Sequence, residues 1–178
     1  LPETCMQDEY AAGISSSHFI FGVWQVGFDT STSEIYLIVM RNIAAHFNIT
    51  DFLTPPQCDD CLTIDILDYK PSLNFIELKV SLRNNTPLTA YDVRGIMMVN
   101  IEGIILQNAD GFTDLWDDGG EITVNPFKAY ATDQPGRMFG PDTGHARIYE
   151  IDYTSIADLV STQIVVDASW PGNCREPY

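Results

Sequence analysis

The sequence predicts an all-β protein, specifically an antiparallel β-sandwich of immunoglobulin-like character. Apolar and polar residues alternate along several segments, turn-forming residues are dense between those segments, and helical periodicity is nearly absent. The chain has 178 residues, of which 45% are hydrophobic, and this is enough to bury a sizeable core. No repeat or linker divides the chain, so we expect a single domain over residues 1–178.

The alternation predicts about eight strands. It is clearest over Phe75–Leu82, where every second residue is apolar, as in a strand with one buried face. Phe19–Phe28 and Tyr91–Val99 are apolar on both faces, which is typical of central strands covered on each side. No convincing helix is present: only Thr154–Val160 and part of Asn42–Leu53 could form one, and the alternation in the second favours a strand. The remaining expected strands are Ile35–Met40, Ile43–Ile49, Leu62–Ile66, Ala146–Tyr153 and Thr162–Trp170.

The segment Asn100–Asp142 has little periodicity and is rich in acidic and aromatic residues. We expect it to form one long loop region, and loops of this length usually carry function or cover a sheet edge.

The charge balance excludes two classes of partner. The chain has 25 acidic and only 9 basic residues, for a formal net charge of -16, and the basic residues are scattered singly. Nucleic acid and anionic lipid require clustered cations, so neither is an expected partner. The longest apolar stretches fall well short of the roughly 20 residues that span a bilayer, so no membrane insertion is expected.

The four cysteines predict an oxidising compartment. They allow three pairings, of which we favour Cys5 with Cys174, at opposite ends of the chain, and Cys58 with Cys61. A redox-active pair is disfavoured because the two aspartates between Cys58 and Cys61 would raise the thiol pKa. A zinc site would need a second pair of ligands, and the three histidines are isolated along the chain. We therefore expect structural disulfides in a secreted protein.

The acidic part of the long loop is the best candidate for a metal site. Five acidic residues fall within twelve positions beside three glycines, and oxygen ligands on a turning backbone suit calcium. The spacing is not that of an EF-hand, because Leu115 stands where that loop requires glycine. A solvated acidic loop without a cation is the alternative. The five candidate ligands are Asp110, Asp114, Asp117, Asp118 and Glu121.

Aromatic residues near the same loop suggest a binding surface. Phe112, Trp116 and Tyr130 could stack against a saccharide, or they could plug the end of the sandwich. A pair of the loop carboxylates could also serve a glycosidase, but adjacency in sequence says nothing of the required separation, and no hydrolase motif is present. Within the strand Tyr91–Val99, Asp92 and Arg94 could form a buried ion pair that fixes the strand's register.

Self-assembly is the third hypothesis. The run Ile35–Met40 has high β-propensity and contains neither lysine nor proline, the residues that usually guard an edge strand. If it lies at an edge, it can recruit a second copy, and a contact of that kind propagates into a filament or layer.

Five segments of the chain carry a resemblance to known proteins. They read SHFIFGVWQV (17–26), PPQCDDC (55–61), YDVRGI (91–96), NPFKAYA (125–131) and VDASWPGNCREPY (166–178). Together they resemble a group of secreted or lipid-anchored surface proteins of environmental bacteria, and the similarity spans nearly the whole chain. The group has no established activity to carry over, and the resemblance implies export and a β-rich domain at the N-terminus of a larger exported protein. Lipid anchoring is not expected, because Cys5 follows Pro-Glu-Thr rather than a lipobox.

The expected function is therefore that of a non-catalytic, extracellular structural or binding module of the bacterial cell surface. It would bind copies of itself or other surface proteins and could assemble into a filament or layer. The alternative is a calcium-dependent carbohydrate-binding or hydrolase-associated module.

Overall fold

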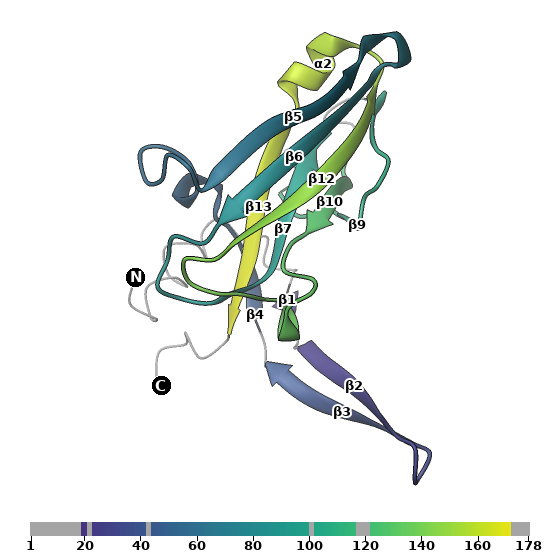
Figure 1. The fold of residues 1–178 in the computed structure, drawn as a ribbon, viewed down its shortest axis with the longest axis vertical. Helices are drawn as coiled ribbons and strands as arrows, with labels where there is room; N and C mark the ends of the chain where they lie inside the picture. The colour runs from purple at the N-terminus through teal and green to yellow at the C-terminus, as the bar shows by residue number, and fades with distance from the viewer. Residues whose placement is uncertain (1–18, 21–22, 42–43, 100–101, 117–121, 172–178) are drawn as a thin grey trace.

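The fold is an all-β sandwich of antiparallel strands, as the sequence predicts (Figure 1). The computed structural model describes residues 19–20, 23–41, 44–99, 102–116 and 122–171. Whether the sandwich is immunoglobulin-like and whether residues 1–178 form a single domain both stay predictions. None of the helices in the described part of the chain is long and apolar enough to cross a membrane.

One layer is a seven-stranded sheet with the order β1-β4-β13-β7-β10-β9, in which β11 also pairs with β7. The prediction that the segment Tyr91–Val99 forms a central strand is confirmed, since β7 lies between β13 and β10. The strands are β1 (Phe19–Ile20), β4 (Ala44–Asn48), β7 (Ala90–Met98), β9 (Gly111–Thr113), β10 (Asn125–Ala129), β11 (Met138–Phe139) and β13 (Gln163–Pro171).

The other layer is a four-stranded sheet with the order β5-β6-β12-β8. Figure 1 shows β5, β6 and β12 in front of β13 and β7. The strands are β5 (Leu62–Lys70), β6 (Phe75–Arg83), β12 (Gly144–Tyr153) and β8 (Ile104–Leu106). The short helical elements are η1 (Thr50–Phe52), η2 (Pro71–Leu73), η3 (Pro135–Arg137) and α2 (Ile156–Ser161), the last of which overlaps the candidate helix Thr154–Val160.

The core lies between the two sheets. Val80 on β6 and Tyr149 on β12 are fully buried from one side, and Val93 on β7 and Val166 on β13 are fully buried from the other. Because side chains alternate along a strand, the neighbours of Val166 on β13 face away from this core. Asp167 therefore lies on the outer face of the seven-stranded sheet, where the candidate site forms.

The predicted long loop is corrected in one respect. The region Asn100–Asp142 contains four short strands, β8 to β11, three of which extend the seven-stranded sheet. Their two to five residues are too few to show alternation in the sequence. The acidic and aromatic residues of this region therefore lie partly on strands rather than on one free loop.

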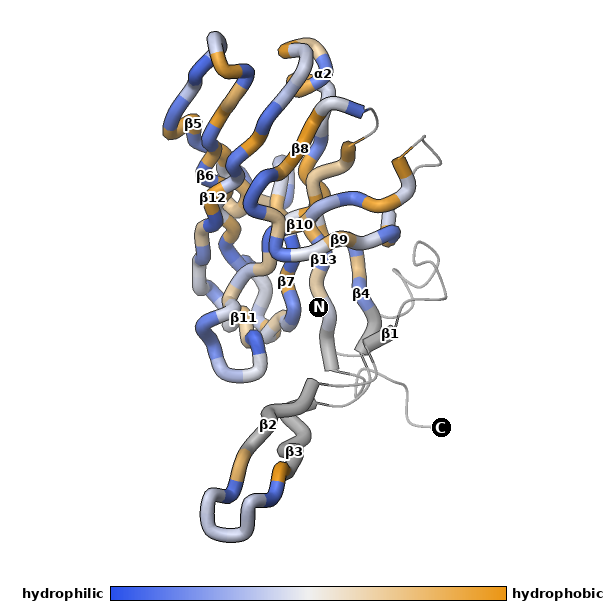
Figure 2. The backbone as a smooth tube through the Cα atoms, turned by 90° about the vertical axis from the view of Figure 1, so that its right-hand side faces the viewer, coloured by the Kyte–Doolittle hydropathy of each residue, from blue (hydrophilic) through white to orange (hydrophobic). Residues whose placement is uncertain are grey.

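A hairpin projects from the sandwich. Strands β2 (Val23–Asp29) and β3 (Glu34–Arg41) pair with each other in a separate two-stranded sheet, and both views show them apart from the two layers (Figures 1 and 2). The prediction that Phe19–Phe28 is a central strand covered on both sides is wrong. The segment divides into β1 and β2, and the side chain of Phe28 is 59% exposed.

Candidate functional site

The outer face of the seven-stranded sheet gathers charged side chains from three neighbouring strands. The register places Asp167 of β13 opposite Arg94 of β7, and Arg94 in turn opposite Ala129 of β10. On the other side of β13, Ser169 lies opposite His46 of β4. Cross-strand partners share a face, so the carboxylate, the guanidinium and the imidazole meet on one surface.

Asp167 is the centre of this group. Its carboxylate is completely buried and accepts two hydrogen bonds from Arg94, from Nε to Oδ1 at 2.9 Å and from Nη2 to Oδ2 at 2.5 Å. The indole Nε1 of Trp116 donates to Oδ2 at 3.1 Å, and Nδ1 of His46 lies 3.3 Å from the same oxygen. The last contact lacks hydrogen-bond geometry, so we treat it as electrostatic. A buried carboxylate with this many partners is held in one position.

The ionised form of Asp167 is favoured despite its burial. Desolvation alone would raise the pKa of this carboxyl, since a charged group is costly in a low dielectric. His46 and Arg94 outweigh that effect, and together they hold the pKa of Asp167 below its usual range. The residue is therefore an anion that anchors the guanidinium rather than an acid that donates a proton.

A β-bulge shapes the site next to this pair. The register of β13 against β7 shifts between Asp167 and Ser169, so that two residues of β7, one of them Asp92, lie opposite one residue of β13. Asp92 is 6% exposed and has a left-handed backbone, with φ of 45°. Its Oδ1 lies 3.3 Å from Nη1 of Arg137, whose own φ is 56°. Bulges of this kind commonly re-aim side chains at functional sites.

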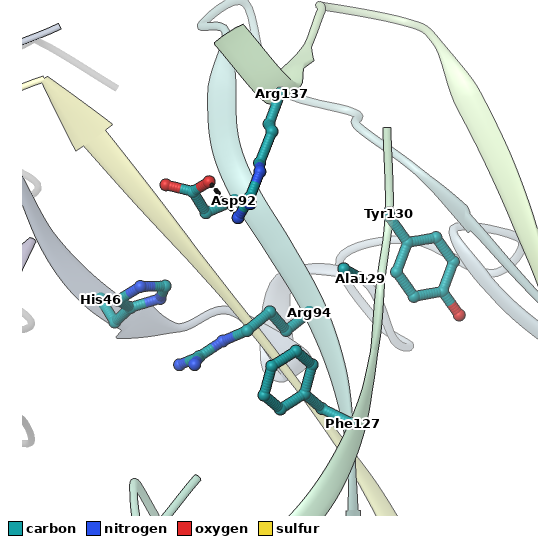
Figure 3. Close-up of a pocket in the computed structure, with 7 residues that line it drawn as sticks. All are labelled: His46, Asp92, Arg94, Phe127, Ala129, Tyr130 and Arg137. Carbon is teal, nitrogen blue, oxygen red and sulfur yellow. Dashed lines mark hydrogen bonds and ion pairs between the residues drawn. The ribbon is translucent and has the colours of Figure 1, made fainter. Parts of the chain in front are cut away.

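A pocket of about 300 Å³ opens over these residues (Figure 3). In the close-up, the guanidinium of Arg94 extends toward His46, and Asp92 and Arg137 lie above both of them in the view. The ring of Phe127 stacks on Arg94, with the guanidinium carbon 5.0 Å from the ring centroid. The lining residues include His46, Asp92, Arg94, Phe127, Tyr130 and Arg137.

Sequence reasoning anticipated an ion pair here but assigned the wrong partners. The predicted pair of Asp92 with Arg94 does not form, because Arg94 binds Asp167 and Asp92 binds Arg137. In the sequence His46 is one of three isolated histidines, yet in the structure it is 5% exposed and lines the pocket. The sequence offers one signal for this site, which is an aspartate, Asp167, among the apolar residues of a predicted strand. Its partners cannot be read from the sequence, because they lie on strands whose order in the sheet is not known beforehand.

The acidic loop is placed differently from the prediction. Asp110 is an ion-pair centre: its Oδ1 lies 2.9 Å from Nζ of Lys128, and its Oδ2 accepts from Nη2 of Arg147 at 2.8 Å and from the amide of Ala129 at 2.8 Å. Burial raises the pKa of Asp110, but these partners outweigh it and lower the pKa overall. Both oxygens of Asp110 therefore contact internal cations, and its place in the calcium set stays a prediction.

The remaining members of the predicted calcium set are only partly described. Asp114 is exposed and follows the last residue of β9, whereas Asp110 precedes the first residue of that strand. Asp117, Asp118 and Glu121 lie outside the described residues. Within the described ranges, the one group of side chains close enough to share a metal ion is Cys58, Asp60 and Cys61, and its two sulfurs are joined.

The three aromatic residues of the predicted binding surface lie in different environments. Phe112 is 65% exposed and stays available as a binding residue. Trp116 is half-buried and donates its indole N–H to Asp167. Tyr130 is fully buried, with its hydroxyl donating to the carbonyl of Val80 at 3.2 Å, so it is a core residue rather than an exposed stacking ring.

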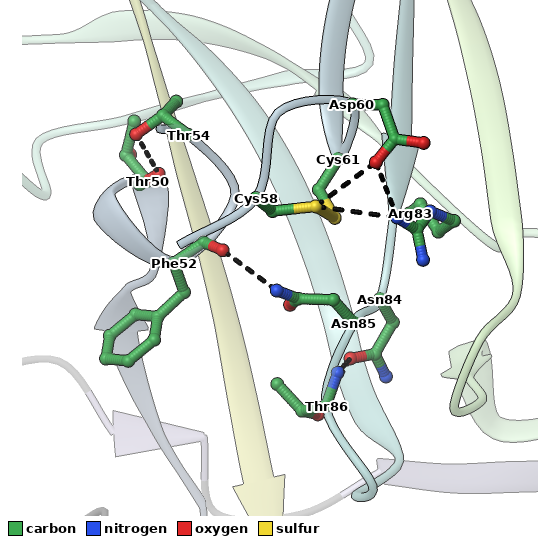
Figure 4. The surroundings of a disulfide bond; sticks show 10 residues. All are labelled: Thr50, Phe52, Thr54, Cys58, Asp60, Cys61, Arg83, Asn84, Asn85 and Thr86. Carbon is green, nitrogen blue, oxygen red and sulfur yellow. Dashed lines mark hydrogen bonds and ion pairs between the residues drawn. A yellow bond between two sulfur atoms is a disulfide. The ribbon is translucent and has the colours of Figure 1, made fainter. Parts of the chain in front are cut away.

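The predicted disulfide between Cys58 and Cys61 is present (Figure 4). It lies in the loop before β5, beside an ion pair in which Nη2 of Arg83 is 2.5 Å from Oδ1 of Asp60. This arrangement supports the structural interpretation of the cysteine pair over the zinc and redox alternatives. Cys5 and Cys174 lie outside the described residues, so their pairing stays a prediction.

The tip of the β2–β3 hairpin is a second candidate for interaction. Phe28 and Ile35 pair across the ribbon, and they are 59% and 72% exposed. The turn beyond them is ordered by Asp29, whose Oδ1 accepts from the amide and hydroxyl of Ser31 at 2.8 and 2.6 Å. These bonds lower the pKa of Asp29. The tip therefore presents an apolar pair on a defined turn.

Comparison with known proteins adds no relative. A scan against protein-family models, a search of curated proteins and a search of solved structures each find no match for this chain. Function must accordingly be argued from the side chains themselves.

Proposed function

We propose that this chain is a non-catalytic, extracellular module of the bacterial cell surface that associates with copies of itself through the β2–β3 hairpin. The observation that carries the proposal is the projecting ribbon with Phe28 and Ile35 exposed at its tip. An isolated two-stranded hairpin is marginally stable in water, so a ribbon of this length gains stability from a surface that covers it.

The composition of the ribbon supports self-association. The segments 23–28 and 35–40 contain no charged residue, although the chain as a whole carries a net charge of -16. Two copies of so acidic a protein repel each other, and these uncharged segments keep that repulsion low along the ribbon, whose acidic residues Asp29 and Glu34 pair at the tip. Apolar side chains exposed on a projecting element are typical of protein contact sites.

The edge strand β5 supplies a second surface for the same contact. In the described sheet β5 pairs on one side only, with β6, and so offers unpaired backbone groups. Ile64, Ile66 and Leu67 on this strand are 49%, 66% and 50% exposed. A hairpin of one copy against β5 of the next is a heterologous contact, and such contacts extend into filaments or layers.

Two features support an extracellular, non-catalytic role. The Cys58–Cys61 disulfide favours an oxidising compartment. Among the described pocket residues there is no serine, cysteine or threonine to act as a nucleophile. Ser169 is opposite His46 in the register, but it is fully buried and its hydroxyl donates to the carbonyl of Tyr91.

Light scattering over a concentration series tests the proposal. We expect the mass to grow well beyond the 19.9 kDa of one chain, and to grow more in higher salt because salt screens the repulsion between copies. Ile35→Ser should suppress this growth. Val160→Ser is the matched control, since Val160 is 79% exposed on α2, at the other end of the molecule in Figure 1.

A constant mass near 19.9 kDa at all concentrations and salt levels would overturn the proposal. Equal loss of association in both variants would also contradict it, because that result indicates non-specific apolar aggregation rather than a contact through the hairpin.

A further inference from the structure

We propose that the pocket over Arg94, Arg137 and His46 binds the carboxylate of a small organic molecule. This site lies on the outer face of the seven-stranded sheet and is distinct from the exposed tip of the hairpin, although β2 contacts η3, the element that carries Arg137. Five observations carry the proposal: the unused donors of two arginines, the buried imidazole nitrogen beside them, the backbone that holds them, the aromatic wall and the size of the cavity.

The two arginines keep donors that their internal partners do not use. Arg94 binds Asp167 through Nε and Nη2, and Nη1 makes no hydrogen bond within the described residues. Arg137 binds Asp92 through Nη1, which leaves Nε and Nη2 without a described partner, and its side chain is 58% exposed. A guanidinium presents five N–H donors in a planar fork whose geometry matches a carboxylate.

A buried imidazole nitrogen lies beside these donors. Nδ1 of His46 makes no hydrogen bond to any described group, although the residue is 5% exposed. Buried polar atoms in native proteins nearly always have a hydrogen-bond partner, so an atom without one calls for an explanation. Its nearest described polar atom is Oδ2 of Asp167 at 3.3 Å, outside hydrogen-bond geometry, so a ligand oxygen or a ligand-bound water would supply the bond that this contact does not make.

The backbone around the pocket is held in costly conformations. Asp92 and Arg137 both have φ in the left-handed region, at 45° and 56°, and neither is a glycine. Left-handed backbone is disfavoured for residues with a Cβ, and such residues cluster at ligand sites where the surroundings over-determine them. The bulge at Asp92 and the turn at Arg137 together place their ion pair at the rim of the cavity.

The cavity suits a small ligand with an apolar or ring-shaped body. Its volume of about 300 Å³ is at the lower end of the range for small-molecule sites. Phe127 forms one wall, and its contact with Arg94 at 5.0 Å keeps the guanidinium plane fixed before any ligand arrives.

The charges of the pocket favour a singly charged carboxylate over phosphate. Arg94 and Arg137 are each balanced by an aspartate, so the four groups have no net formal charge. A dianion would gain no long-range attraction in such a site, and the nearby carboxylates would repel it. A carboxylate carries only one negative charge, so this repulsion is smaller, and its two oxygens can accept from the remaining N–H groups of Arg94 and Arg137.

Two sources of carboxylate fit this description: an acidic sugar and a free amino acid. Galacturonate and alanine represent them as probes, with inorganic phosphate as the dianion and galactose as the uncharged match of galacturonate. We would titrate each into the full-length, isotope-labelled protein and follow amide and indole signals by NMR. The indole N–H of Trp116 is the direct reporter, because it donates to the carboxylate that anchors Arg94.

We expect saturable shifts with galacturonate or alanine at millimolar concentrations, and weaker or no shifts with galactose and phosphate. Arg137→Gln should weaken binding of the carboxylate at least about tenfold. The variant should still give the spectrum of a folded protein, since the Arg137 side chain is mostly exposed. Lys70→Gln is the matched control. It removes one positive charge from an exposed ion pair with Asp68 on the other sheet, and we expect unchanged affinity.

Tighter binding of galacturonate would indicate an acidic sugar as the ligand, and tighter binding of alanine would indicate a free amino acid. The proposal is overturned if neither carboxylate gives saturable shifts, if phosphate binds more tightly than both, or if Arg137→Gln and Lys70→Gln have the same effect.

Discussion

Replacing Arg94 with methionine should destabilise the fold more than any surface change. The substitution keeps an unbranched apolar stem as far as the position of Nε but leaves the Asp167 carboxylate, which is completely buried, without the two hydrogen bonds from the guanidinium. Removing one partner of a buried ion pair costs about 3–5 kcal/mol, because an uncompensated charge stays in a low dielectric. Since Arg94 itself is 14% exposed, we expect a loss of about 3 kcal/mol, at the lower end of this range.

Urea unfolding followed by tryptophan fluorescence measures this loss. With a slope of about 2 kcal/mol per molar urea, a loss of 3 kcal/mol moves the midpoint by about 1.5 M. The double variant Arg94→Met with Asp167→Leu should recover part of the stability, since replacing both partners by apolar groups removes the stranded charge. A single variant that loses less than about 1 kcal/mol would refute the reasoning, because Asp167 would then be stabilised without Arg94.

The dependence on pH provides a second check on the same variant. The pKa of Asp167 is lowered in the folded state, so the stability from its ionisation is present above the unfolded value of about 3.9 and is lost as the pH falls through the folded value. In Arg94→Met, protonation relieves the buried charge instead. The difference in unfolding free energy between the two proteins should therefore begin to shrink above about pH 4, as the variant's carboxyl takes up its proton, and should shrink further below about 4, where the wild type loses stability.

Three further changes test the remaining structural assignments. Gly95→Ala should cost about 1–3 kcal/mol, because a Cβ at this position would lie 2.2 Å from the Tyr149 hydroxyl oxygen; an unchanged melting temperature would contradict this. Cys58→Ser should cost about 2 kcal/mol by opening the short loop to Cys61, and dithiothreitol should lower the melting temperature of the wild type by at least as much, since it also reduces the predicted Cys5–Cys174 bond. Asp110→Asn should cost about 1–3 kcal/mol in urea unfolding by leaving two cations without their carboxylate, and no loss would mean that those ion pairs contribute nothing.

The strands of the sandwich could be predicted where one face is buried and the other is wet. Phe75–Leu82 has that pattern, and it forms β6 over Phe75–Arg83. The strand β10 could not be found in this way, because it is five residues long and contains Pro126, a residue that normally argues against an interior strand. Its place between β7 and β9 is a tertiary property that no local pattern encodes.

The candidate site was harder to predict for a related reason. In Val166–Trp170 the alternation places Asp167 on the polar face, and a polar face usually indicates contact with water. Here that face is covered, since Asp167 is fully buried beneath Trp116 and beside His46. Which residues cover the face depends on strand order and on the course of the chain after β9. These are set by packing over the whole domain.

The same ion pair links the register of the sheet to the proposed pocket. Side chains alternate along a strand, so a slip of one residue between β13 and β7 would turn Asp167 into the core and separate it from Arg94. The high cost of an unpaired buried carboxylate therefore selects a single register. That register also directs the third nitrogen of Arg94 toward the cavity and places the bulge at Asp92 beside it. A carboxylate bound there would complete a network that the fold must build for its own stability. The pocket can therefore stay preformed without a ligand, and binding need not be coupled to folding of the sheet.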